Sequence, residues 1–205
     1  MTLIMKIITL LSFLCASFAL QAQLLKEGTS IGVTFSGLGK SGHFIPYALG
    51  DPGYDGKGYF SLGITYIRPL SDRFDLEIGA EYSRIGNRFL PYPGSGENVP
   101  AAPDFYVSFI DVSAAVRFNF SNYFFFNGGA LLSTDVRNTR FNKTGSILGV
   151  GAMLGVGAKY DFRNVPIGLF FNPYVKHRSI FTVFDKGYAP RVLDAGFRFG
   201  VVYNF

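Results

Sequence analysis

The sequence of 205 residues contains no tryptophan, a single cysteine and only 16% charged residues. Hydrophobic residues make up 48% of the chain and aromatic residues 17%. Disordered chains show the opposite balance of charge and hydrophobicity, so this composition excludes disorder. Beyond the N-terminal region, no stretch has the about 18 consecutive apolar residues that a membrane-spanning helix needs. The composition therefore fits a membrane protein without spanning helices, and lipid then leaves only a closed β-barrel.

The N-terminal segment has the parts of a secretory signal peptide. Lys6 supplies the positive charge, residues 7–20 are apolar, and Ala22 precedes the expected cleavage point. An apolar stretch of about 14 residues is too short to cross a bilayer as a helix. We therefore expect a signal peptide at 1–22 and one mature domain at 23–205.

Metal, thiol and cofactor chemistry have little support in the sequence. Cys15 lies inside the expected leader, after large residues rather than the small ones of a lipoprotein signal, so the mature chain has no thiol. His43 has no second ligand nearby, and the glycines at 149–157 are spaced for a strand face, not for a phosphate-binding turn. We expect no cofactor and no metal. The formal charge of +5 is mild and gives no basis for nucleic-acid binding.

The mature chain has a hydrophobic period of two, which is the period of β-strands. From Leu193 to Phe205, apolar residues occupy every second position, and the residues between them are mostly small or polar. Seven upstream segments repeat this alternation. The eight strands that we expect span roughly 28–38, 58–70, 74–86, 105–120, 123–134, 146–162, 166–179 and 192–205.

The connections between these strands alternate in length. Those at 71–73, 121–122 and 163–165 are tight, and those near 39–57, 87–104, 135–145 and 180–191 are long. Tight turns at one end and long loops at the other are typical of bacterial outer-membrane barrels. An even number of strands also places both ends of the barrel domain on the tight-turn, periplasmic side. The fold class that we predict is all-β, an eight-stranded antiparallel transmembrane up-and-down barrel.

The alternative fold is a soluble sandwich or a lipocalin-like barrel, in which the polar row faces water. Here the polar row consists largely of glycine, serine and alanine, which is thin for a water-facing exterior. The apolar row contains large phenylalanine and leucine side chains that would overfill an eight-stranded interior. The volumes fit when the apolar row faces lipid.

This register places six acids and five bases inside the barrel, and buried charges need partners. We expect a salt-bridge network that closes the lumen; the alternative is a small polar pore. The predicted lumen charges are Asp75, Glu77, Glu81, Asp111, Arg117, Lys159, Asp161, Lys176, Arg178, Asp194 and Arg198. Tyrosine and phenylalanine are expected to form both interfacial belts, with Tyr59 and Tyr106 among those at the outer rim.

The eight alternating strands and the C-terminal Val201 to Phe205 segment resemble the small outer-membrane barrels of Bacteroidota, the PorT-like group, which are related in form to the OmpX and OmpA barrels. The resemblance implies an outer-membrane location; many members of this group have no assigned activity, and a few are accessory parts of a secretion system. We predict a protein without catalytic activity in a structural, adhesive or secretion-accessory role. The resemblance also implies that Tyr203 and Phe205 contribute to the C-terminal signal that the barrel-assembly machinery reads. Expected partners are outer-membrane lipid, lipopolysaccharide at a weakly basic outer rim, and secretion-system components.

One local motif has a catalytic alternative. His177 and Ser179 have the spacing of the His-x-Ser pair in PagL-type lipid A deacylases, where a histidine base activates a serine nucleophile at the membrane face. Strict alternation places both side chains on the lipid side. Ile180 and Phe181 follow where that group has Asn-Ala, and no carboxylate to orient the histidine is evident. Pro173 upstream would invert these positions if it introduced a bulge.

Overall fold

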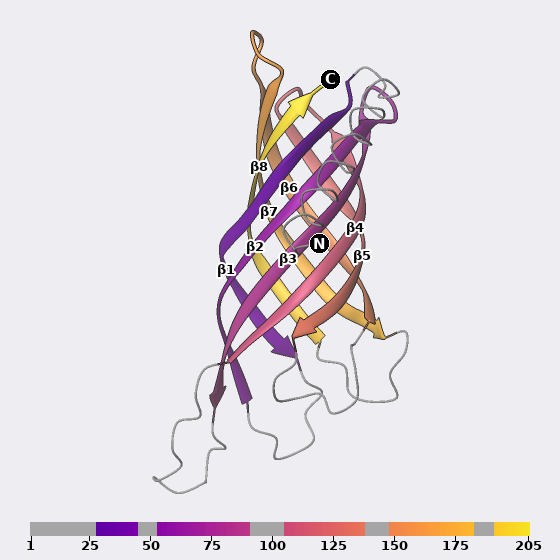
Figure 1. Cartoon of the computed structure of the whole chain (residues 1–205). Coiled ribbons are helices and arrows are strands. Elements are labelled where there is room, and N and C mark those ends of the chain that lie inside the picture. The colour runs from indigo at the N-terminus through magenta and orange to yellow at the C-terminus, as the bar shows by residue number, and fades with distance from the viewer. Residues whose placement is uncertain (1–27, 45–52, 91–104, 138–147, 183–190) are drawn as a thin grey trace, which may run out of the picture.

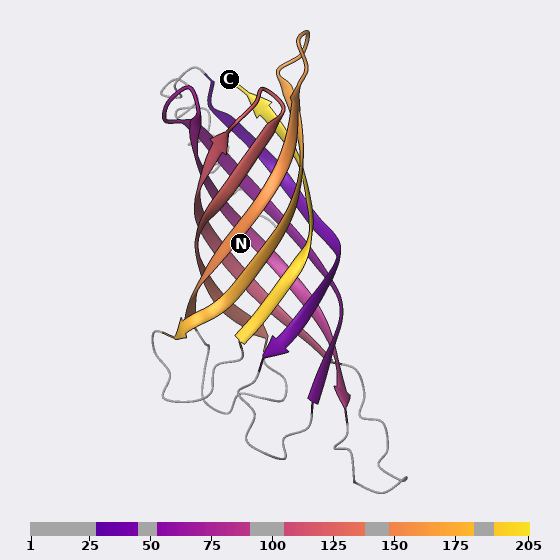
Figure 2. The ribbon, with the colours of Figure 1, turned by 180° about the vertical axis from the view of Figure 1, so that it is seen from behind.

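The computed structural model describes residues 28–44, 53–90, 105–137, 148–182 and 191–205. They form a closed barrel in which the strands follow one another in chain order and the last pairs with the first. Figures 1 and 2 show the barrel from opposite sides, with inclined strands and the C-terminus at the end of the tight turns. The predicted eight-stranded antiparallel barrel is confirmed. The expected signal peptide at 1–22 lies outside the described residues.

The eight strands contain between 14 and 17 residues each. Their bounds are β1 Ser30–Phe44, β2 Gly53–Pro69, β3 Phe74–Leu90, β4 Phe105–Asn119, β5 Phe124–Arg137, β6 Leu148–Asp161, β7 Ile167–Thr182 and β8 Arg191–Asn204. Among the described residues, no helix is long and apolar enough to cross a membrane.

Several strands continue further toward the loop end than the alternation predicts. β1 reaches Phe44 rather than residue 38, and β3 reaches Leu90 rather than residue 86. The polar and glycine-rich ends hide the period of two, yet their backbones still pair: Phe44 with Arg191 and Leu90 with Gly53. At about 3.3 Å per residue and a tilt near 40°, such strands exceed the roughly 25 Å apolar band of a membrane barrel.

The two faces of the wall differ as the alternation predicts. In β4, Val112 and Val116 are about half exposed on the outside, while Asp111 and Arg117 are 2% exposed inside. In β6 the inward positions from 149 to 157 are glycines and one methionine, and the outward positions are apolar. The exterior is therefore mostly apolar and the interior holds the buried charges, which is the reverse of a water-soluble barrel.

Inward glycines leave room for aromatic rings that fill the lumen. A Cβ placed on Gly157 would lie 2.4 Å from the ring of Phe125, and one on Gly200 would lie 2.1 Å from the ring of Phe170. No side chain fits at such distances. The glycines that the alternation places inside the barrel are thus packing positions for large neighbours on the facing strands.

Bulges alter the alternation near the loop end. Leu38 has a φ of 57°, and the register between β1 and β8 shifts between Gly37 and Lys40. Ser179 has a φ of 53°, and the register between β6 and β7 shifts beside it. Bulges are frequent at barrel rims, where they re-aim side chains.

Candidate functional site

The charged interior is divided into two groups, and the group nearer the loop end is centred on Asp111 of β4. Arg178 Nη2 lies 2.7 Å from Asp111 Oδ2, and Lys176 Nζ lies 3.2 Å from the same oxygen. Lys176 also pairs with Glu81, and Arg178 also pairs with Asp194. Strands β3, β4, β7 and β8 thus contribute to one set of linked ion pairs.

Two serines complete this group. Arg178 Nη2 donates a hydrogen bond of 2.9 Å to Ser83 Oγ, and Ser133 Oγ donates to Asp111 Oδ1. Neither serine was singled out in the sequence, although both occupy inward positions of the alternation. A polar side chain at an inward position beside predicted lumen charges is the signal that would have identified them.

The second group lies toward the tight-turn end and is centred on Glu77 of β3. Arg117 Nε lies 2.6 Å from Glu77 Oε2, and Arg198 Nη2 lies 2.7 Å from Glu77 Oε1. Asn127 Nδ2 donates a 3.2 Å hydrogen bond to Oε2. Glu77 is 1% exposed, and it carries two guanidinium groups from β4 and β8 on one carboxylate.

Aromatic rings stack on these buried cations. The Arg117 guanidinium carbon lies 4.4 Å from the ring centroid of Phe125 and 4.6 Å from that of Phe170. The guanidinium carbon of Arg178 lies 5.1 Å from the ring centroid of Phe109. The ring faces offer partial negative charge to cations that are removed from water, which adds to the ion pairs.

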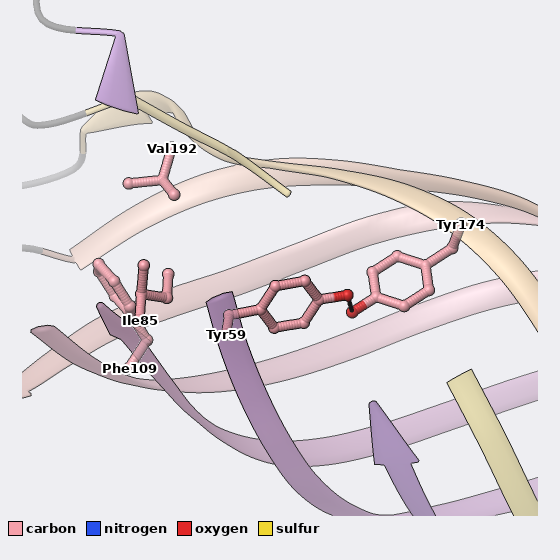
Figure 3. Close-up of a cluster of buried hydrophobic side chains, with 5 residues drawn as sticks. All are labelled: Tyr59, Ile85, Phe109, Tyr174 and Val192. Atoms are coloured by element: carbon pink, nitrogen blue, oxygen red, sulfur yellow. Dashed lines mark hydrogen bonds between the residues drawn. The ribbon is translucent and has the colours of Figure 1, made fainter. Parts of the chain in front are cut away.

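Two apolar clusters accompany the charged groups. Toward the loop end, the side chains shown in Figure 3 pack together, and the hydroxyl oxygens of Tyr59 and Tyr174 share a hydrogen bond at 2.7 Å. Toward the turn end, Ile67 and Val202 pack with Phe125 and Phe170. Tyr59 is expected in the outer interfacial belt, and this prediction is wrong: the side chain is 6% exposed and lies inside the lumen, because its neighbour Phe60 occupies the outward position.

The space that remains between the two charged groups is small. A cavity of about 10 Å³ is bounded by Glu81, Asp111, Leu131, Met153 and Lys176, among others. Such a volume holds the centre of about one water molecule. Between the two charged groups, side chains therefore fill the described lumen, as eight strands lead one to expect.

Three of the predicted lumen charges do not belong to either group. Asp75 and Lys159 are half-buried and Asp161 is exposed, and all three line an open hollow of about 780 Å³ at the tight-turn end. Asn119 donates to Asp75 at 2.8 Å and Asn204 donates to Asp161 at 3.0 Å. All three side chains lie near strand ends, where water solvates them, so the prediction of a buried network is wrong at these three positions.

The structure separates the two residues of the His-x-Ser motif. His177 keeps its outward register position opposite Ala152 and Leu193. Ser179 is 5% exposed, and its Oγ lies 2.2 Å from where a Cβ of inward-facing Gly149 would be. The bulge at Ser179 turns its hydroxyl inward, so the prediction that both side chains face lipid is wrong.

Pro173 does not invert the register. Tyr174 faces Gly155 and Phe171 faces Ala158, so β6 and β7 keep one alignment on both sides of the proline. The outward positions before the bulge, including Val175, therefore follow the simple alternation. No group of three or more metal-ligating residues occurs among the described part of the chain.

The C-terminal strand closes the barrel. Tyr203 pairs with Ile31 of β1 and Ile167 of β7, and its ring centroid lies 5.0 Å from that of Phe205. Both aromatic side chains are exposed on the outside at the tight-turn end. This is the position that the C-terminal assembly signal predicts, and recognition of these residues stays a prediction.

Three solved structures resemble the chain at low sequence identity. The N-terminal β-barrel domain of Pseudomonas aeruginosa OprF is 14% identical, with 87% of this chain and 98% of that one covered and a TM-score of 0.42. Ail, the attachment invasion locus protein of Yersinia pestis, is 15% identical, with 88% and 100% covered and a TM-score of 0.45. The outer membrane protein OprG of P. aeruginosa is 12% identical, with 88% and 97% covered and a TM-score of 0.47. No protein-family model and no curated protein matches the sequence.

Proposed function

We propose that the chain is an integral outer-membrane β-barrel with a closed lumen, without catalytic activity, which holds its loops at the cell surface in a structural, adhesive or secretion-accessory role. The apolar exterior is the observation that carries this proposal. Large side chains such as Leu62, Ile64, Leu154 and Val156 are more than half exposed. Water-soluble monomers rarely expose contiguous apolar patches above a few hundred Å². Lipid is the solvent in which such a wall is stable.

An aromatic belt at the tight-turn end supports the same proposal. Tyr123 stacks on Tyr160, with ring centroids 6.4 Å apart, and the Tyr160 and Phe162 rings meet edge to face at 5.1 Å. All three side chains are exposed on the outside. Aromatic girdles mark the membrane interfaces of outer-membrane barrels, and here tyrosine and phenylalanine form one without tryptophan.

The purified barrel is expected to insert into lipid vesicles and to conduct no ions. The two charged groups and the two apolar clusters occupy the described lumen, and we expect them to block the passage of ions. Co-sedimentation with vesicles checks insertion, and planar-bilayer recording checks conductance. Protein that stays soluble without detergent would contradict the membrane proposal, and stepwise conductance would favour a small pore.

The lipid A acylation pattern is expected to be the same with and without the His-x-Ser pair. The side chains of His177 and Ser179 face opposite sides of the wall, so the histidine is not placed to activate the serine hydroxyl. Cells expressing the parent chain, H177A, S179A or no barrel are compared by mass spectrometry of lipid A. Acyl loss that requires both residues would establish the deacylase alternative.

The partner class within this proposal follows from the resemblance to the Bacteroidota PorT-like barrels and from the exterior of the barrel. We expect the barrel-assembly machinery to contact Tyr203 and Phe205 during biogenesis, and lipid or lipopolysaccharide to surround the mature wall. A secretion-system component is the protein partner that the resemblance implies. Pull-down of the barrel from detergent-solubilised native membrane tests for this partner. If the barrel acts alone, no secretion-system component is recovered with it.

A further inference from the structure

The outer wall carries an apolar groove that is separate from the lumen. It has a volume of about 730 Å³ and crosses five neighbouring strands, from β5 through β6, β7 and β8 to β1. Its floor includes Pro173, Ala195 and glycines, and larger outward side chains such as Phe126 and Phe197 border it. Small residues between large ones make this part of the wall concave.

The groove has a direction with respect to the membrane. At one end lies Lys40, four residues before the loop end of β1, and at the other lies Phe126, two residues after the tight-turn start of β5. Because the strands are inclined, a path across them also runs from the loop side toward the turn side. The bulge at Leu38, which is 81% exposed, lies at the loop-side end beside Lys40.

Lys40 is the one charged side chain among the described residues that line the groove. It is exposed and its pairing partner on β8, Ala195, is an outward residue of the groove. A lysine stem packs along apolar surface while its ammonium group reaches the interface. The groove therefore combines an apolar floor with a single charged side chain, among the described residues, at its loop-side end.

We propose that this groove binds lipid A, with an acyl chain along the apolar floor and a phosphate at Lys40 Nζ. The proposal rests on the membrane insertion proposed above. Loops of outer-membrane barrels face the exterior, so Lys40 lies at the outer leaflet, where lipid A supplies both phosphate and acyl chains. A basic residue at a membrane surface attracts such anionic headgroups.

Charge also argues against a second copy of the chain as the occupant. The outward strand residues whose side chains the structure describes include the cations Arg68, Arg84 and Arg88 but no aspartate or glutamate. The described outward side chains of a second copy would therefore bring no acid to Lys40. A phosphate provides the opposite charge that the end of the groove requires.

The test uses the full mature barrel in detergent micelles and measures lipid A binding by native mass spectrometry. A195L fills the groove and K40Q removes its charge. The matched controls are A114L, which enlarges an exposed outward alanine on β4, and R68Q, which removes an outward cation near the turn end of β2. We expect A195L and K40Q each to weaken binding about fivefold, and the controls to bind as the parent does.

A second probe separates the phosphate from the acyl chain. With dephosphorylated lipid A, K40Q is expected to bind as the parent does, while A195L still binds more weakly. Equal binding by A195L, K40Q and both controls overturns the groove proposal, as does a dimer that A195L abolishes. Vesicle co-sedimentation distinguishes the two failures: a barrel that inserts but shows no groove effect refutes the lipid A site alone, whereas a barrel that stays out of vesicles refutes the membrane proposal as well.

Discussion

E77A is expected to lower the free energy of unfolding by about 3–5 kcal/mol, because it removes one partner of a buried ion-pair group. Arg117 and Arg198 both pair with Glu77, at 2.6 and 2.7 Å, and both are almost fully buried. Without the carboxylate, two guanidinium charges remain inside the lumen, and their remaining contacts are with aromatic rings and amides. Urea titration of the refolded barrel in lipid vesicles, followed by circular dichroism, measures the change.

D75A is the matched control for E77A. Asp75 lies two residues away on the same strand and also occupies an inward position, but it is half-buried at the open turn end. Its contact is a single hydrogen bond from Asn119. We expect D75A to cost less than about 1.5 kcal/mol, the upper end for one ordinary hydrogen bond. Equal losses for the two variants would contradict the claim that Glu77 organises the buried group.

A triple variant separates the cost of an orphaned charge from the net value of the ion pairs. Replacing Glu77, Arg117 and Arg198 together by leucine or methionine leaves no buried charge behind. Such replacements in other proteins are close to neutral or stabilising. We therefore expect the triple variant to be more stable than E77A. The difference in the free energy of unfolding between the triple variant and the parent measures the net contribution of the ion pairs.

The sequence predicts which charged residues lie inside the lumen, but it does not predict which of them form ion pairs. The period of two places Glu77, Arg117 and Arg198 on the inner face, and the structure agrees. Their mutual contact depends on the stagger between strands, which brings β3, β4 and β8 residues from different sequence positions to one level. Alternation within a strand contains no information about that stagger, so it predicts which charges share the lumen but not which of them pair.

The sequence predicts the apolar side chains inside the lumen less well than the charged ones. Phe125 is the middle residue of three consecutive phenylalanines, and Phe170 is followed by a second phenylalanine. The sequence around them therefore shows no alternation of apolar and polar residues that would mark either one as inward. Both point inward because their neighbours occupy the outward positions. They fit because facing strands have glycine at 157 and 200. Such a pair consists of a large residue on one strand and a glycine opposite it on the neighbouring strand. It can be identified only when the register between the two strands is known.

The bulge at Ser179 is the clearest failure of simple alternation. Pro173 does not explain the position of the bulge, because the register is the same on both sides of the proline. Ser179 has a positive φ although it is not a glycine, so its residue type does not predict this conformation. A residue in the left-handed region there reverses the direction of one side chain and leaves His177 in place. The catalytic alternative requires these two residues to face the same side, so this local backbone feature is an argument against it.

V112R is expected to lower the free energy of unfolding by about 2–4 kcal/mol, because it places a cation at the middle of the lipid-facing wall. Val112 is the central residue of β4, with seven residues on either side, and its side chain is 48% exposed. If water surrounded this position, replacement by arginine would change the free energy of unfolding by about 0.5 kcal/mol or less. The size of the loss therefore reports whether lipid or water surrounds the wall.

V136R provides the depth control for V112R. Val136 is equally exposed, at 47%, and also faces outward, but it lies one residue before the loop end of β5. Near the interface, arginine costs about 0–1 kcal/mol because its head group reaches water and lipid phosphates. Unfolding of both variants in the same vesicles compares the two depths directly. A large loss for V112R with little change for V136R is the depth dependence that only a bilayer imposes, whereas small and equal losses would mean that the apolar wall is not solvated by lipid.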